Sequence, residues 1–252
     1  MICRMSNMME PVLSAGNSMV LGFMGIPPTL LLLIGATMLV SFLAQFQLKR
    51  RFAQHSREPI PATGKQVAEQ MLKECGIDDV QVISVPGQLT DHYNPINKTV
   101  NLSEVVYHMN NVAAAAVAAH ECGHAVQHAK AYRWLTMRSK LVPVTQFASK
   151  TMNIVMWISI LGVFALQTPI FLWVYVACLA MTTLFAFITL PVEFDASKRA
   201  MAWLRTSGMS GTMKQDKAEN ALFWAAMTYV VAALSSLAML IYYLSIILGR
   251  RN

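Results

Sequence analysis

The sequence has little charge for its length. Of its 252 residues, 13% are Asp, Glu, Lys or Arg, whereas 55% are hydrophobic. A soluble globular domain carries about 25% charged residues, so this chain lacks the polar surface that would keep it in water. Residues 11–48, 151–192 and 220–249 contain no charged residue at all. A small soluble core cannot hide this much apolar sequence, and the composition therefore indicates a membrane protein.

The charge-free stretches predict about four membrane-spanning helices, since a helix needs roughly 20 apolar residues to cross a bilayer. The first span follows an N-terminal segment (1–25) and occupies residues 26–46. Residues 151–190 form a hairpin of two spans that turns at Gln167-Thr168-Pro169, and residues 221–248 form the fourth span. The polar segments 47–150 and 191–220 then share one face of the membrane and are together large enough for one small domain.

Basic residues set the expected orientation. They follow the first span, precede the second and lie between the third and fourth, and such clusters mark the cytoplasmic side. We therefore expect the N-terminus and the 167–169 turn outside and the small domain in the cytoplasm. Arg250 and Arg251 fall on the other side, which is a point against the fourth span. The basic clusters beside the expected spans account for the net charge of +7, so no nucleic-acid binding is predicted.

The sequence also lacks paired cysteines. Its four cysteines are far apart and form no CxxC pair, which favours free thiols in a reducing compartment. The first span ends in Lys49-Arg50-Arg51 rather than in a cleavage site, as a retained signal anchor does. The cysteines are Cys3, Cys75, Cys122 and Cys178.

The polar segment 47–150 predicts a mixed α+β domain. A short amphipathic helix is expected at 64–74, ended by Gly76. Alternating, β-branched residues predict strands at 80–85, 90–93 and 99–102. Asn110-Asn111 precede an alanine-rich run at 112–129, which predicts a strong helix with an asparagine cap.

That helix contains His120-Glu121-Cys122-Gly123-His124, an HExxH motif. Residues four apart share one face of a helix, so His120 and His124 can bind one zinc ion, while Glu121 can reach a water molecule on the metal. We therefore predict Glu121 as a general base. Gly123 permits close approach of another backbone, and the apolar flanks of the helix suit a buried metal site.

A zinc peptidase needs a third protein ligand. The HExxHxxGxxH pattern is excluded because position 130 is Lys130. His128 lies one turn beyond His124 along the same face and cannot close around the same ion, so it is interpreted as a helix-end histidine. Glu193 follows two spans after His124 and therefore returns to the same side of the membrane, which makes it the predicted ligand.

The other carboxylates leave alternatives open. Asp195 is a candidate to orient a metal-binding histidine, and a structural pair with Arg199 is an equal alternative. Asp91 and Glu104 do not have a spacing that favours them as ligands.

The chain resembles the bacterial neutral zinc metallopeptidases, a family of membrane proteases. The resemblance covers nearly the whole chain and rests on residues 91–95, 100–103, 106–107, 117–127 and 190–197. It implies His120, His124 and Glu193 as zinc ligands and Glu121 as the catalytic residue. More distantly, the chain is similar to HtpX-type membrane proteases, whose site is closed by a Glu on an ExxAD-like segment. Ser197 stands where that segment has Asp, so the role of that Asp does not carry over.

In a zinc peptidase of this kind we expect the hairpin at 91–102 to lie beside the helix that carries the HExxH motif. An edge strand there can hold an extended substrate. His92 and Tyr93 are candidates for contacts with the substrate or the transition state. Packing of both side chains against the helix is the equal alternative.

The sequence thus predicts an α-helical membrane protein with a small α+β, zincin-like domain. We expect a zinc metalloendopeptidase with one Zn²⁺ per chain, in the bacterial inner membrane, acting at a cytosolic site near the bilayer. Its expected partners are the lipid bilayer and a protein or peptide substrate, with membrane proteins as candidates, and the sequence identifies no partner subunit. The alternatives are an inactive zinc-binding scaffold, an intramembrane protease and a hydrolase of another amide or ester.

Overall fold

The computed structural model describes residues 27–162, 169–208 and 212–249. Within these ranges the chain is mostly helical and has one small sheet. The elements, in chain order, are α2 (Pro28–His55), α3 (Gly64–Glu74), β1 (Gln81–Val85), β2 (His92–Asn94), β3 (Thr99–Ser103), α4 (Glu104–His108), α5 (Val112–Ala129), α6 (Arg133–Gly162), α7 (Pro169–Thr206) and α8 (Thr212–Gly249).

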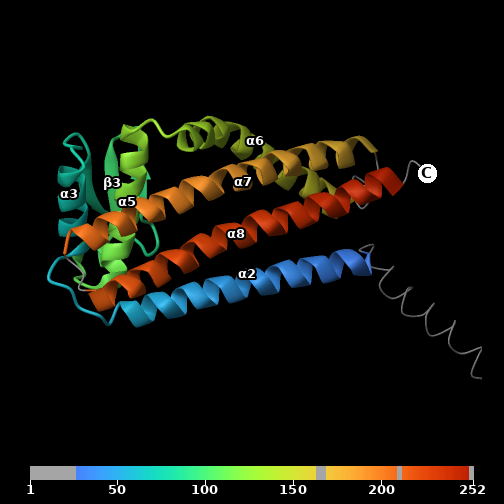
Figure 1. Cartoon of the computed structure of the whole chain (residues 1–252). Helices are drawn as coiled ribbons and strands as arrows, with labels where there is room; N and C mark the ends of the chain where they lie inside the picture. Colours follow the sequence, from blue (N-terminus) through green and yellow to red (C-terminus); the bar gives the residue numbers. More distant parts are fainter. Residues whose placement is uncertain (1–26, 163–168, 209–211, 250–252) are drawn as a thin grey trace, which may run out of the picture.

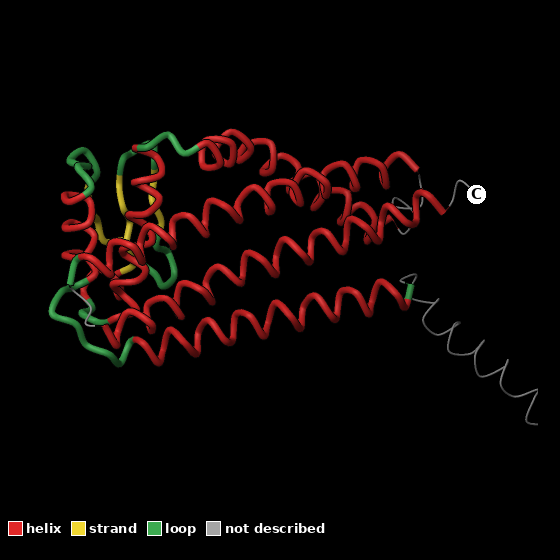
Figure 2. Tube along the Cα trace, in the orientation of Figure 1, coloured by secondary structure: helices red, strands yellow, loops and turns green. Residues whose placement is uncertain are grey.

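Two regions are visible in the arrangement of these elements. The long helices α2, α7 and α8 run side by side, with α6 against α7, and extend away from a cluster of short elements (Figure 1). The three strands all lie in that cluster (Figure 2). We call this cluster, made of α3, α4, α5 and the sheet, the sheet end of the molecule. The C-terminal end of α2 and the N-terminal end of α8 meet there, so the chain enters and leaves the sheet end through long helices.

The described ranges contain three helices that are long and apolar enough to cross a membrane. They lie within Pro28–His55, Ile170–Thr206 and Asp216–Gly249, and therefore match the first, third and fourth of the four spans that the sequence predicts. The expected second span corresponds to the end of α6, whose described part stops at Gly162. Most of the expected turn at 167–169, the N-terminal segment 1–25 and Arg250-Arg251 lie outside the described residues.

The spans do not end where the polar segments begin. α7 continues through the expected boundary at residues 190–191 without a break, although Pro191 lies inside it. α2 likewise runs nine residues past position 46, to His55, and α8 begins before position 221. A helix satisfies its own backbone hydrogen bonds, so it can pass from an apolar to a polar environment without a change of conformation. The boundaries drawn from composition therefore mark a change of environment rather than the ends of helices.

The sheet has β3 at its centre. β1 pairs with β3 in parallel and β2 pairs with β3 antiparallel. β2 begins two residues later than the sequence predicts, and a side chain explains the difference. The Asp91 carboxylate accepts hydrogen bonds from the backbone N–H and the hydroxyl of Ser103, at 2.7 and 3.0 Å. The N–H of Ser103 is therefore bonded to a side chain at the point where β2 would otherwise pair with it.

α5 forms the centre of the sheet end. Asn111 caps it, because its side chain accepts a hydrogen bond from the N–H of Ala114 at 2.8 Å. Its alanine-rich surface is buried against α3, the sheet, α7 and α8. Cys122 is fully buried and faces α3, where its thiol lies 3.5 Å from the carbonyl oxygen of Ala68. The helix that the sequence predicts at 112–129 is therefore confirmed, and it is held on several sides.

α3 also agrees with its predicted range. Thr63 and Gln66 form a reciprocal capping box at its start, and Gly76, with φ of +70°, follows its end. The short helix α4 was not predicted. Three of the four cysteines lie in described residues, and Cys75, Cys122 and Cys178 are all free thiols there.

Candidate metal centre

The HExxH residues project from α5 toward α7. His120 and His124 lie on one face of α5, and their rings meet edge to face with centroids 4.8 Å apart. Glu193 of α7 approaches the same point and is 2% exposed. The structure therefore brings together the three side chains that the sequence predicts as ligands, although 69 residues separate Glu193 from His124.

Gly123 permits this approach of α7 to α5. A Cβ atom at this position would lie 2.6 Å from the carbonyl oxygen of Ala196 and 3.1 Å from its Cα. Such distances are far below van der Waals contact, so any larger residue would push the helices apart. The glycine that the sequence marks for close backbone approach lies directly against the backbone of α7.

The facing atoms are one nitrogen of each ring and the carboxylate. His120 Nε2 lies 3.2 Å and His124 Nε2 lies 3.7 Å from the same Glu193 oxygen. The candidate ligand atoms of all three residues fall within 4.8 Å of one another. Two imidazoles and one carboxylate are a donor set that zinc uses in catalytic sites, so the residues present fit a zinc ion.

The second nitrogen of each ring is held by a neighbour. Ser197 Oγ lies 3.1 Å from Nδ1 of His120. The side-chain oxygen of Gln127 lies 3.0 Å from Nδ1 of His124. Such partners fix the ring orientation and leave Nε2 free for a metal. Ser197 therefore contacts His120 directly and helps to orient its ring. It occupies the position where the distantly similar proteases have Asp.

Asp195 reaches the centre through Gln127. Gln127 is fully buried and donates hydrogen bonds from Nε2 to the carbonyl oxygen of Val192 and to Asp195, both at 2.8 Å. Asp195 also accepts a hydrogen bond from Arg199 Nε at 2.6 Å. Of the two alternatives for Asp195, the pair with Arg199 is present. The carboxylate bonds to Gln127 rather than to a histidine, and it reaches His124 only through that residue.

Glu121 lies beside the three candidate ligands and is bound differently. One of its oxygens accepts a hydrogen bond from the backbone N–H of Tyr93 at 3.0 Å, and the residue is 8% exposed. β2 therefore holds the Glu121 carboxylate at the edge of the sheet, next to the metal centre.

The side chains of His92 and Tyr93 each contact a group outside the three candidate ligands. Nδ1 of His92 lies 2.7 Å from the carbonyl oxygen of Thr90. The hydroxyl of Tyr93 lies 2.8 Å from Nδ1 of His128. His128 thus has a partner in the hairpin and lies outside the group of candidate ligands. Tyr93 reaches the centre through its backbone, and burial, with the charge of Asp79, raises the pKa of its hydroxyl.

Electrostatics at the centre favour a protonated His124 when no metal is bound. Burial works against a charged ring, but the hydrogen bond to Glu193 and the charges of Glu121 and Glu193 outweigh it. Together they raise the pKa of His124 above its ordinary value of 6.5. Protons and a metal ion would therefore compete for this ring.

A cleft of about 420 Å³ opens onto the centre. Its lining includes His120, Glu121, His124 and Glu193, together with His92, Tyr93, Arg138 and Tyr229. Arg138 Nη1 lies 3.6 Å from Glu193. Arg138 and Tyr229 come from α6 and α8, and no local pattern in the sequence marks them. Gln127 could have been found, because its spacing of three residues places it beside His124 on α5.

Two comparisons with known proteins agree on one family. The family described as "Putative neutral zinc metallopeptidase" matches residues 30–248. The chain is 37% identical over 215 residues to "Putative membrane protease YugP" of Bacillus subtilis (strain 168), across 84% of this chain and 94% of that protein. No solved structure matches the chain.

Proposed function

The chain belongs to the family of neutral zinc metallopeptidases, and we propose that it is a membrane-embedded zinc metalloendopeptidase that cleaves at the α5–α7 cleft. The observation that carries the proposal is the convergence of His120, His124 and Glu193, whose ligand atoms lie within 4.8 Å of one another. In this assignment the three residues hold one zinc ion.

Zinc bound there would acidify a water molecule and polarise a peptide carbonyl group. Glu121 is well placed to accept the proton of the attacking water and to pass it to the leaving amine. The N–H of Tyr93 supports this role, because it holds one oxygen of Glu121 at 3.0 Å and keeps the carboxylate beside the ligands. Ser197 and Gln127 would keep the two imidazoles aligned during the reaction.

We also propose that β2 holds the substrate. β2 is an edge strand, paired only with β3 within the described sheet, and an extended peptide can add to such an edge. Tyr93 N–H lies on that edge and is already bound to Glu121. The peptide would therefore form hydrogen bonds with other backbone groups of β2, or it would replace the Glu121 carboxylate as the acceptor of the Tyr93 N–H when it binds. His92 and Tyr93 remain candidates for contacts with the substrate.

In the cell we place the protein in the bacterial inner membrane with four spans and the sheet end in the cytoplasm. The positions of the basic residues support this orientation. The candidate site lies at one end of the long helices (Figure 1), which favours cleavage near the membrane surface over cleavage within the bilayer. Protein segments close to the membrane are the substrates that this position favours.

The test is zinc content and casein cleavage, measured together on detergent-purified protein. Wild type should hold about one zinc per chain. Glu193→Gln should lose most of it, and Glu121→Gln should retain zinc but cleave nothing. The control is Glu104→Gln, an exposed carboxylate of α4, which should match wild type in both measurements.

Three results would contradict parts of the proposal. Normal zinc content in Glu193→Gln would place the third ligand elsewhere. Cleavage by Glu121→Gln at the wild-type rate would remove its role as base. Zinc in every variant with cleavage in none would favour the inactive scaffold.

A further inference from the structure

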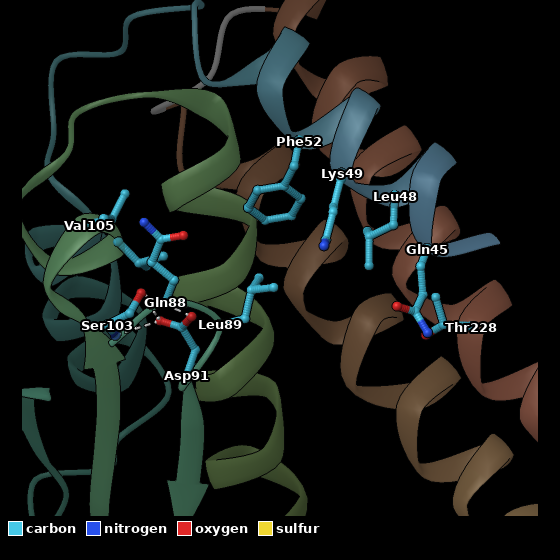
Figure 3. A pocket seen from close by; sticks show the side chains of 11 residues that line it. Gln45, Leu48, Lys49, Phe52, Gln88, Leu89, Asp91, Ser103, Val105 and Thr228 are labelled. Atoms are coloured by element: carbon cyan, nitrogen blue, oxygen red, sulfur yellow. Dashed lines mark hydrogen bonds between the residues drawn. The ribbon is translucent and has the colours of Figure 1, made fainter. Parts of the chain in front are cut away.

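A second cavity, of about 640 Å³, lies between α2 and the sheet end. Figure 3 shows the side chains of Leu48, Lys49 and Phe52 directed from α2 into the space between α2 and Leu89. We call this space the α2 cavity. Its lining includes Leu48, Lys49, Phe52, Leu89, Asp91 and Val105.

A smaller cavity of about 170 Å³ shares lining residues with both the α2 cavity and the cleft at the metal centre. Glu121 and Glu193 line both this smaller cavity and the cleft at the centre. Leu48, Phe52 and Leu89 line both the smaller cavity and the α2 cavity. The three spaces are therefore neighbours, and the smaller cavity lies between the cleft and the α2 cavity.

The walls of the α2 cavity expose apolar side chains. Leu89 is 69% exposed and Val105 is 47% exposed, while Leu48 and Phe52 are half-buried. Leu89 also has φ of +58°, in the left-handed region that costs a leucine about 1 kcal/mol or more. An exposed leucine gains little core packing that would offset this strain. Strained residues of this kind occur at binding sites, and Leu89 has this conformation in the bend between β1 and β2.

Two charged residues also face the cavity. The Asp91 carboxylate is already bound by the N–H and hydroxyl of Ser103. The ammonium group of Lys49 has no hydrogen bond or ion pair with any residue that the structure describes. Lys49 is exposed, and its positive charge would repel lysine and arginine side chains. Asp91 keeps its negative charge, because its partners at Ser103 are uncharged, so it reduces that repulsion without reversing it at the α2 side of the cavity.

We propose that the α2 cavity is a substrate subsite that accepts a bulky apolar side chain adjacent to the scissile bond, and that Lys49 excludes lysine and arginine from it. The inference rests on the proposed peptidase function and adds a specificity to it. α2 is then part of the substrate-binding machinery as well as a membrane span. The position of the cavity beside the metal centre favours a substrate side chain over a lipid chain as the occupant.

The test compares cleavage preferences on a library of peptides, read by mass spectrometry. Wild type should favour bulky apolar residues at one position beside the cleaved bond and disfavour lysine and arginine there. Leu48→Trp fills the cavity and should reduce cleavage at bulky residues by roughly ten- to two-hundredfold. Lys49→Glu should raise acceptance of lysine and arginine by about tenfold, which corresponds to about 1.4 kcal/mol.

Phe46→Trp is the matched control. Phe46 also lies on α2 and is 54% exposed, but it does not line the cavity, so the variant should retain the wild-type preference. The zinc content of each variant reports whether the centre is intact. If Leu48→Trp and Lys49→Glu retain zinc and the wild-type preference, the subsite assignment is wrong.

A binding measurement separates this inference from the proposed function. Fluorescein-labelled casein is titrated against Glu121→Gln, with and without Leu48→Trp, and fluorescence anisotropy reports binding. Weaker binding with Leu48→Trp would support the subsite even if no variant cleaves, whereas equal binding would overturn it. Loss of a copurifying lipid from Leu48→Trp, with casein binding unchanged, would assign the cavity to a lipid chain instead.

Discussion

At the scale of single residues, Gln127 links the metal centre to α7. It is fully buried, its oxygen lies 3.0 Å from Nδ1 of His124, and its nitrogen donates to Val192 and Asp195. We expect Gln127→Leu to weaken zinc binding by about 10- to 100-fold, because His124 loses the partner that orients it. Competition with a chelator measures the change. Gln70→Leu, which removes only a surface bond to Glu74, is the control and should bind zinc normally.

The raised pKa of His124 gives a second prediction at this scale. Only the neutral ring binds a metal ion, so zinc competes with a proton that is held more tightly than in an ordinary histidine. The zinc affinity should therefore begin to fall above pH 6.5, the ordinary value, and continue to fall as the pH decreases. Zinc titrations at a series of pH values measure this. His108→Ala, at an exposed position, should give the same profile, and an affinity that stays constant to below pH 6.5 would contradict the expectation.

At the scale of elements, the metal centre depends on the close contact between α5 and α7, because its candidate ligands come from both helices. Gly123→Ala places a Cβ atom 2.6 Å from the carbonyl oxygen of Ala196, so the helices must separate. We expect a loss of about 1–3 kcal/mol in stability and a marked loss of zinc, because Glu193 moves away from the histidines. Thermal unfolding and metal content measure the two effects.

Gly35→Ala is the control for that prediction. A Cβ atom at Gly35 meets nothing within 4 Å, so this variant should unfold no earlier than wild type and keep its zinc. If Gly123→Ala behaves in the same way, the close approach of α7 does not limit the assembly of the centre.

At the scale of the whole molecule, the proposed orientation can be tested with thiol labels. Cys75 is exposed at the sheet end, so a membrane-impermeant reagent should label it in inverted vesicles and not in intact cells. Partial burial of its sulfur raises the pKa of the thiol, and labelling should therefore accelerate as the pH rises. Gly249→Cys, at the end of α8, should show the opposite sidedness in a variant that also carries Cys75→Ser. Both measurements need a Cys3→Ser background, and labelling of Cys75 in intact cells would reverse the orientation.

Sequence alone was sufficient for the features that depend on local pattern. The apolar stretches predicted the long helices, and alanine content with Asn111 predicted the range of α5. The spacing of His120 and His124 placed both on one face of a helix, because helical geometry fixes that relation. Glu193 could be predicted because the charge-free stretch 151–192 was interpreted as two spans, which would return the chain to the same side of the membrane, an argument from topology rather than from packing.

Tertiary structure alone decided the features that depend on distant segments. The parallel pairing of β1 with β3, the contacts of Ser197 and Gln127 with the two imidazoles, and the position of Arg138 at Glu193 all join separate elements. The α2 cavity exists because α2 faces the loop before β2 across an open space, beside the smaller cavity that Glu121 lines. No local periodicity encodes these relations, since they depend on how the helices pack once each has formed.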